Sequence, residues 1–233
     1  MPDARLAALD GQRNSAALDE TGGAVFGPLL TAAECAALRK LWEEDLFRSR
    51  IDMRRHGFGS GEYRYFANPL PEPIAALRAA AYRRLAPIAN AWAERLDDGF
   101  RAPPTLDEML ARCHAAGQTR PTPLLLSYSA GDYNCLHQDL YGEIAFPLQL
   151  VVQLSRPGED FAGGEFVLVE QRPRMQSRPT VLAPAQGHGV VFATSRKPRR
   201  GARGWTTSIM RHGVSQLTSG SRMTLGIIFH DAT

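Results

Sequence analysis

The stretch YSAGDYNCLHQD, residues 128–139, ends in the tripeptide His137-Gln138-Asp139. On a β-strand, residues two apart point to the same face, so the imidazole and the carboxylate are expected to converge while the glutamine faces away. These two groups supply two of the three ligands of a 2-His-1-carboxylate site, which holds Fe(II) and leaves other coordination positions open. The dipeptide spacing alone has low specificity, so a third ligand is needed to identify a metal site.

The third ligand is expected at His212, in the sequence RHG at 211–213. Arg222 follows it by ten residues and begins the apolar run RMTLGIIF, residues 222–229. Strand alternation places Arg222 and Thr224 on a face that is otherwise small and apolar, and a buried guanidinium requires an anionic partner. A carboxylate held by two hydrogen bonds fits that position, and Thr224 adds a hydroxyl donor.

Two other histidines and one cysteine compete as ligands. The residue ten positions after His188 is Pro198 rather than a cation, which favours His212 and leaves the role of His188 open. His230 follows the last apolar run and is expected to make a terminal polar contact. Cys135 shares strand parity with the first histidine of the site, but a cysteine there is more often a small core residue than a ligand.

From residue 121 onward, short β-forming runs alternate with turn residues. Strands are expected at 123–129, 133–138, 146–154, 164–169, 179–183, 187–193, 205–212 and 222–229. In the third of these, aliphatic residues on one face alternate with Gln149 and Gln153 on the other. Because no helix is expected between the strands, the pattern favours a closed or double-sheet β fold over residues 121–233.

Residues 1–120 show mainly helical patterns. The expected elements are a strand over 22–30 and helices to about residue 48, over 71–98 and to about residue 116. The sequences Thr31-Ala32-Ala33-Glu34 and Thr105-Leu106-Asp107-Glu108 are capping boxes that begin two of these helices. Pro87 is expected to kink or split the long helix. We expect this region to be a helical support for the β domain, the two forming one compact unit.

Residues 48–66 combine arginines, glycines and aromatic residues. The alternating Gly57, Gly59 and Gly61 are typical of a mobile loop, whereas EYRYF at 62–66 alternates like a strand. The segment is therefore either a surface hairpin or a lid that closes over the site.

The composition is that of an ordinary globular protein, with 44% hydrophobic and 22% charged residues and a net charge of +3. No apolar run reaches the ~20 residues of a membrane span, and the N-terminus lacks the apolar core of a signal peptide. The three cysteines are odd in number and far apart, which argues against disulfides and for the cytoplasm. Ten Arg and Lys residues lie between Glu170 and Asp231, without an acid. They form either a solvated surface or an electropositive rim for an anionic partner.

These motifs together resemble the Fe(II)/2-oxoglutarate dioxygenases, nearest to their prolyl 4-hydroxylase and AlkB-like branches. The tail RHGVSQLTSGSRMTLGIIFHDA at 211–232 is similar to a bacterial family of such oxygenases assigned to alkylated DNA. FAGGEF at 161–166 resembles the Gly-Gly-Glu turn of the family. The resemblance implies an α+β fold with a mostly β core, a double-stranded β-helix or jelly roll over 121–233, preceded by the N-terminal helical annex.

The resemblance also implies the cofactor, Fe(II), and the co-substrates, 2-oxoglutarate and O2. The implied metal ligands are His137, Asp139 and His212. The residues implied to hold 2-oxoglutarate are Arg222, Thr224, Tyr128 and Tyr133.

The implied reaction is hydroxylation or oxidative demethylation, with alkylated nucleic acid as the favoured substrate. The alternatives are a peptidyl, prolyl-type or small-molecule hydroxylase, and a non-catalytic cupin-like protein that binds a metal or ligand. The basic turn 196–205 precedes the strand of His212 and is expected near the metal. Together with the 48–66 segment it supplies the candidate substrate contacts, which are Arg54, Arg55, Tyr63, Tyr65, Arg199, Arg200, Arg203 and Trp205. The oligomeric state is left open.

Overall fold

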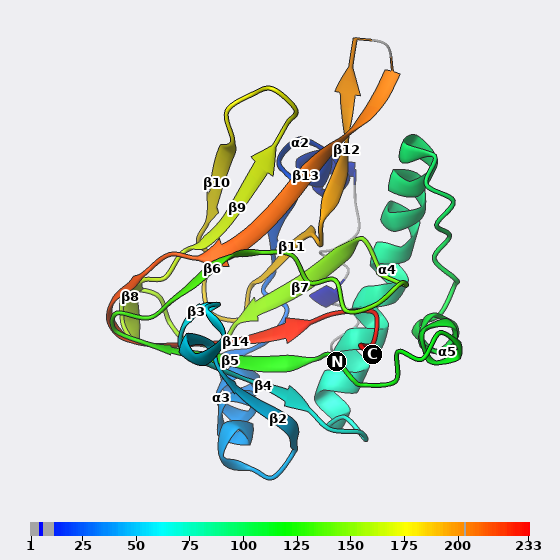
Figure 1. Cartoon of the computed structure of the whole chain (residues 1–233). Helices are drawn as coiled ribbons and strands as arrows, with labels where there is room; N and C mark the ends of the chain where they lie inside the picture. Colours follow the sequence, from blue (N-terminus) through cyan, green and yellow to red (C-terminus); the bar gives the residue numbers. More distant parts are fainter. Residues whose placement is uncertain (1–4, 7–11, 203) are drawn as a thin grey trace.

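Figure 1 shows the computed structural model, which describes residues 5–6, 12–202 and 204–233. Its helices are α2 (Gln12–Thr21), α3 (Ala32–Lys40), α4 (Glu72–Leu96) and α5 (Leu106–Ala115), with 3-10 turns η2 (Leu41–Glu43) and η3 (Met53–His56). Over these described ranges, none of the helices has the length and apolar character needed to cross a membrane.

The strands form two antiparallel sheets that make a jelly-roll core, which confirms the expected fold class. The larger sheet runs in the order β1 (Gly23–Phe26), β11 (Gly189–Ala193), β7 (Leu148–Gln153), β14 (Leu217–Ile227), β5 (Leu124–Ser129), β4 (Glu62–Phe66) and β2 (Phe47–Asp52), with β8 (Phe161–Gly163) also paired to β14. The smaller sheet runs in the order β10 (Arg178–Leu182), β9 (Phe166–Gln171), β13 (Gly204–Val214), β6 (Tyr133–His137) and β3 (Gly59–Ser60), with β12 (Arg196–Gly201) paired to β13.

Helix α4 packs against the β core through its aromatic residues. The Tyr82 ring lies 5.1 Å from that of Phe146 and 6.1 Å from that of Phe229, centroid to centroid. All three side chains are buried, and buried aromatic contacts of this kind contribute strongly to core stability. Of the kink or split expected at Pro87, the split is wrong, because α4 runs unbroken past the proline, and the kink stays a prediction. Buried residues on both sides of the proline hold the helix against the core, which offsets the lost backbone hydrogen bond.

The capping box at Thr31 is present: its side chain accepts from the backbone N–H of Glu34, and the Glu34 carboxylate accepts from the backbone N–H of Thr31. Thr105 likewise accepts from the N–H of Glu108 at the start of α5. Helix α3, which Thr31 caps, is shorter than the helix to about residue 48 that was expected. It ends at Lys40 and passes through η2 into β2, because residues 47–52 pair with β4 rather than continuing a helix.

The segment 48–66 contributes strands to both sheets. β2 and β4 form a hairpin whose second strand pairs with β5, and β3 pairs with β6. The arrangement is closer to the hairpin interpretation than to a free loop, and closure as a lid stays a prediction.

The basic segment 196–205 was expected to be a turn, and this is wrong. Residues 196–201 form β12, which pairs residue by residue with β13 from Arg196 opposite Ile209 to Gly201 opposite Gly204. The two strands project as a long hairpin away from β6 (Figure 1). The pairing satisfies backbone donors and acceptors that a turn would leave to solvent.

Candidate metal centre

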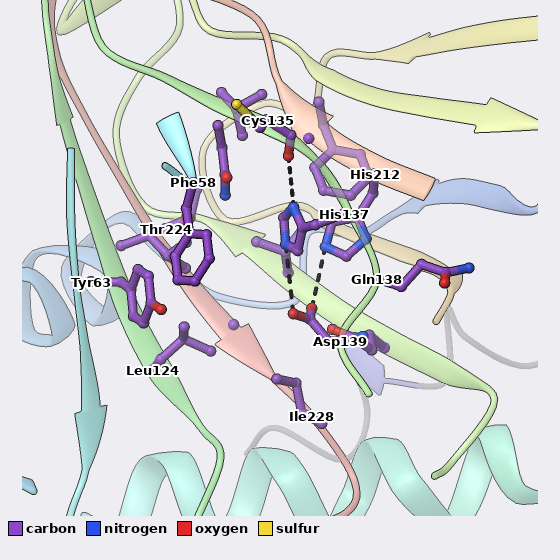
Figure 2. Close-up of a pocket in the computed structure, with 18 of the residues that line it drawn as sticks. Phe58, Tyr63, Leu124, Cys135, His137, Gln138, Asp139, His212, Thr224 and Ile228 are labelled. Carbon is purple, nitrogen blue, oxygen red and sulfur yellow. Dashed lines mark hydrogen bonds and ion pairs between the residues drawn. The ribbon is translucent and has the colours of Figure 1, made fainter. Parts of the chain in front are cut away.

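The metal-ligand candidates meet where β6 and β13 pair. His137 lies directly opposite His212 in the antiparallel register, and their ring centroids are 4.2 Å apart. Asp139 follows the end of β6 and turns its carboxylate toward both imidazoles (Figure 2). Its Oδ1 lies 3.6 Å from His137 Nε2, and its Oδ2 lies 3.3 Å from His212 Nε2. One ligand atom from each residue falls within 4.8 Å of the others, a spacing that one metal ion can bridge.

Two local features bring these strands together. Gly213 follows His212, and a Cβ at that glycine would lie 2.6 Å from the backbone oxygen of Asn134, so a larger residue would push β6 and β13 apart. Gln138 points away from the site, as strand alternation predicts, and its amide donates to the carbonyls of Ser195 and Met210 at 2.8 Å each. These bonds tie the ligand strand to its neighbours.

The electrostatics keep the Asp139 carboxylate ionised and disfavour the imidazolium form of His137. Burial opposes ionisation of Asp139, but hydrogen bonding and the charge of His212 outweigh it and hold the pKa of the carboxyl below its ordinary value. Burial, with the neighbouring His212, lowers the pKa of His137. Nδ1 of His137 lies 2.8 Å from the carbonyl oxygen of Cys135. That acceptor places the proton on Nδ1 and leaves Nε2 with a free lone pair, the form that a metal ligand needs.

Sequence reasoning missed one partner of the carboxylate. The hydroxyl of Tyr141 donates to Asp139 Oδ1 at 2.5 Å, and the hydroxyl of Tyr65 donates to Tyr141 Oη at 3.0 Å. Tyr141 follows Asp139 by two residues, the same spacing that pairs His137 with Asp139, and that repetition was the available signal.

The same cavity, about 320 Å³ in volume, contains a buried cation. Arg222 is 3% exposed, and within the described ranges it has no ion pair and its Nε has no hydrogen-bond partner. Burial lowers the pKa of its guanidinium to about 10. The Arg222 Cζ lies 5.7 Å from the ring centroid of Tyr128, which is opposite it in the β14–β5 register. Tyr128 and Thr224 are also buried and line the cavity.

The register of the larger sheet orders the cavity wall into rows. Side by side across the sheet lie Arg222 with Tyr128, then Thr224 with Leu126 and Tyr63, then Val151 with Gly226, Leu124 and Tyr65. Gln149 lies two residues beyond Val151 on the same face of β7, so its row is six residues from the Arg222 row, about 20 Å at ~3.4 Å per residue. Gln149 is 3% exposed and its Nε2 is buried without a partner in the described structure. The predicted alternation in β7 contained this signal, but did not show which face lines the cavity.

The remaining predicted residues lie in three places. Tyr63, Tyr65 and Cys135 line the cavity, whereas Tyr133 is 42% exposed and does not. Arg54 pairs with Asp132 at 3.3 Å, and Arg55 with Asp52 at 3.5 Å, both next to the cavity-lining Gly57 and Phe58. The residues on the β12–β13 hairpin, outside the cavity lining, are Arg199, Arg200 and Trp205. Arg203 lies outside the described residues.

Neither of the competing histidines joins the ligand group in the described structure. His188 immediately precedes β11, and its Nδ1 lies 3.3 Å from the carbonyl oxygen of Gln186. The ring of His230 is buried and accepts from the N–H of Phe146 at 3.1 Å, the polar contact expected for it.

Comparison with known proteins places this geometry in a family. Residues 61–232 match the model of a family described as "Oxygenase, catalysing oxidative methylation of damaged DNA". An uncharacterized protein of Mycobacterium tuberculosis is 54% identical over 167 residues, which cover 72% of each chain.

Solved structures share the fold at low sequence identity. An oxidoreductase of the 2OG-Fe(II) oxygenase family from Burkholderia pseudomallei has a TM-score of 0.57 and 20% identity, covering 96% of this chain and 94% of that one. A prolyl-4-hydroxylase from Pseudomonas putida has a TM-score of 0.55 and 16% identity, covering 98% and 99%. The family model spans well over half of the chain, and the protein therefore belongs to this oxygenase family, with the fold of the 2OG-Fe(II) oxygenases.

Proposed function

We propose that the protein is a non-haem Fe(II)- and 2-oxoglutarate-dependent dioxygenase that hydroxylates or oxidatively demethylates its substrate. One observation supports this above the others: the cavity that contains the His137, Asp139 and His212 group also contains the buried, unpaired guanidinium of Arg222. A protein that only binds metal has no use for an unpaired buried cation, which is costly to fold. A dicarboxylate that reaches from metal to guanidinium accounts for both features.

The donor set fits the proposed metal. His137, Asp139 and His212 would hold Fe(II) through two imidazole nitrogens and one carboxylate, a set with open positions. When bound, Fe(II) and 2-oxoglutarate supply the activation of O2, with release of succinate and CO2. The protein's own contribution is orientation and exclusion of water, because Asp139, His212 and much of the cavity wall are buried.

The far end of the cavity fits the co-substrate. The Arg222 guanidinium would bind the distal carboxylate of 2-oxoglutarate through two hydrogen bonds. Thr224, on the same strand face, would donate its hydroxyl to the same group. Tyr128 lies beside the guanidinium, and burial raises the pKa of its hydroxyl to about 12, so it would remain a protonated donor. Tyr133 lies outside the cavity and would contact 2-oxoglutarate only after a movement of β6.

For the substrate we favour alkylated nucleic acid, on the family description and on the basic C-terminal half. At the mouth, Phe58 is 48% exposed and its ring stacks on that of His56 at 5.4 Å, with Tyr63 lining the cavity nearby. These flat rings would stack on an unpaired base. Trp205 lies seven residues along β13 from His212, about 23 Å away. At about 3.4 Å per phosphate along one B-form strand, about seven nucleotides would reach from the metal centre to Trp205.

The test begins with anaerobic titration of Fe(II) and 2-oxoglutarate, followed by a succinate-release screen over methylated oligonucleotides and peptides. We expect Arg222→Ala to weaken 2-oxoglutarate binding roughly 30-fold or more, since losing a buried charge pair costs about 2–5 kcal/mol. Fe(II) binding should be nearly intact. Arg178→Ala, at an exposed position on β10, is the matched control. Equal 2-oxoglutarate affinity in wild type and Arg222→Ala would contradict the assignment, and succinate release with peptides alone would favour a protein hydroxylase.

A further inference from the structure

The two oxygens of the Asp139 carboxylate have different surroundings. Oδ1 accepts a hydrogen bond from the Tyr141 hydroxyl at 2.5 Å, whereas Oδ2 faces Nε2 of His212 at 3.3 Å and accepts from no other donor in the described structure. Oδ1 also lies 3.6 Å from Nε2 of His137, so each oxygen faces one of the two imidazoles. Oδ2 is therefore the oxygen that is free of a hydroxyl donor and available to an ion.

A second tyrosine, Tyr65, orients the hydroxyl that donates to Oδ1. The hydroxyl of Tyr65 donates to Tyr141 Oη at 3.0 Å, so the Tyr141 proton is directed toward the carboxylate. The Tyr65 ring lies under the Arg48 guanidinium, whose Cζ is 4.6 Å from the ring centroid, and Arg48 in turn donates to the carbonyl of Pro121. Hydrogen bonds in such a chain polarise and strengthen one another in a buried setting. The β2–β4 hairpin thus reaches the metal centre through two tyrosines.

We propose that Tyr141 is a positioning residue that limits Asp139 to binding the metal through Oδ2 alone, with Tyr65 fixing Tyr141. Binding through both oxygens would require Oδ1 to turn away from the Tyr141 hydroxyl and break this chain. One-oxygen binding leaves one more coordination position for the co-substrate and O2 than two-oxygen binding would. The inference rests on the proposed function, because it concerns the same metal site.

The test uses isosteric hydroxyl deletions and cobalt as a spectroscopic probe. Tyr141→Phe, Tyr65→Phe and the double variant are titrated with Co(II) under anaerobic conditions, and Co(II) affinity and visible d–d absorption are recorded with and without 2-oxoglutarate. Tyr82→Phe is the matched control, since it also loses a buried tyrosine hydrogen bond, to the Pro103 carbonyl at 2.9 Å, but lies away from the cavity lining.

We expect Tyr141→Phe to lower the Co(II) affinity by about 10- to 100-fold, the usual effect of removing a hydrogen-bond partner of a metal ligand. Its visible absorption should differ from that of the wild type, because Oδ1 would then be free to bind the ion in place of a water. Tyr65→Phe should shift both readouts in the same direction by less, and the double variant should match Tyr141→Phe. Tyr82→Phe should leave both unchanged despite any loss of stability.

Two results separate the inference from the proposed function. If the wild-type protein binds neither Co(II) nor Fe(II), the proposed function fails and the inference fails with it. If the wild type binds metal and 2-oxoglutarate but Tyr141→Phe has the wild-type affinity and spectrum, the inference alone is overturned. A Tyr141→Phe protein whose spectrum is unchanged while its stability falls as in Tyr82→Phe would also overturn it, since Tyr141 would then be structural only.

Discussion

Arg222 lies directly opposite Tyr128 in the β14–β5 pair, and within the described structure no carboxylate forms an ion pair with its guanidinium. The negative charge of Glu165 raises the pKa of Arg222 from a distance, without an ion pair in the described structure. The Glu165 carboxylate instead accepts a hydrogen bond from the hydroxyl of Ser215. A buried charge without a counter-ion destabilises the fold. Proteins keep such groups at functional sites, where a bound ligand supplies the missing counter-ion.

The first prediction follows from that cost. Replacing Arg222 with methionine should raise the free energy of unfolding of the metal-free protein by about 1–3 kcal/mol, because an unsatisfied buried polar group is removed. For a chain of this size that corresponds to roughly 2–4 °C in Tm per kcal/mol. Urea and thermal unfolding measure the change, and calorimetry with 2-oxoglutarate should show that binding is lost. A variant less stable than wild type would mean that the guanidinium already has a stabilising partner.

The second prediction concerns the ligand group. His137→Ala, Asp139→Ala and His212→Ala should each abolish Fe(II) binding and 2-oxoglutarate turnover, because two ligands cannot fix the ion. Circular dichroism should show that each variant stays folded. His188→Ala is the control, since that residue immediately precedes β11 and lies outside the ligand group. Full turnover in Asp139→Ala would refute the site.

Much of the centre was predictable because it depends on local periodicity. The i, i+2 spacing of His137 and Asp139 and the alternation around Arg222 do not require knowledge of which strands pair. The Tyr65–Tyr141 hydrogen bond joins residues 76 positions apart and depends on β4 pairing with β5, which single-strand patterns do not report. Gln149 was visible as a polar residue on one face of its strand. Only the sheet register shows that this face lines the cavity.

The prediction of a turn over the basic segment 196–205 was wrong for a related reason. Its Arg and Pro content is typical of a turn, but pairing with β13 overrides local propensity and turns it into an extended hairpin. As a result the cations and Trp205 lie far along β13 from the metal rather than beside it. Nothing in the sequence of β12 alone indicates this direction.

The third prediction concerns a buried ion pair that holds the end of β14 to α4. Arg78 and Asp231 are each 2% exposed and pair at 2.9 Å, and Arg78 also donates to the carbonyl of Ile228, which lines the cavity. Arg78→Met should destabilise the protein by up to about 3–5 kcal/mol, because the buried Asp231 carboxylate loses the guanidinium and keeps the partly exposed His114 ring, with Nε2 at 3.0 Å, as its partner. The exposed pair of Arg50 with Glu62 gives the contrast, and Arg50→Met should cost less than about 1 kcal/mol in the same urea titration. Similar losses in both would contradict the role assigned to burial.

The last prediction tests nucleic-acid binding by the β12–β13 hairpin. Affinity for a methylated single-stranded oligonucleotide should fall steeply as salt rises, because each phosphate contact releases counterions. Replacing Arg199 and Arg200 together with alanine should flatten the slope of log K against log salt by roughly 0.7 per lost contact, about 1.4 in all. The Arg200 guanidinium also lies 5.0 Å from the Trp205 ring, so Trp205→Ala should weaken binding with little change in slope.

The control and the length of the oligonucleotide make this test decisive for the hairpin. Arg178→Ala removes one exposed cation from β10, at the far edge of the smaller sheet, and should leave the slope unchanged. An oligonucleotide of three nucleotides is too short to reach from the cavity to Trp205, about 23 Å along β13. It should therefore show no difference between wild type and the double variant, whereas one of ten nucleotides or more should. A slope that is unchanged with the longer strand would remove the hairpin from the binding surface, and the absence of salt-dependent binding at low ionic strength would remove nucleic acid as the substrate.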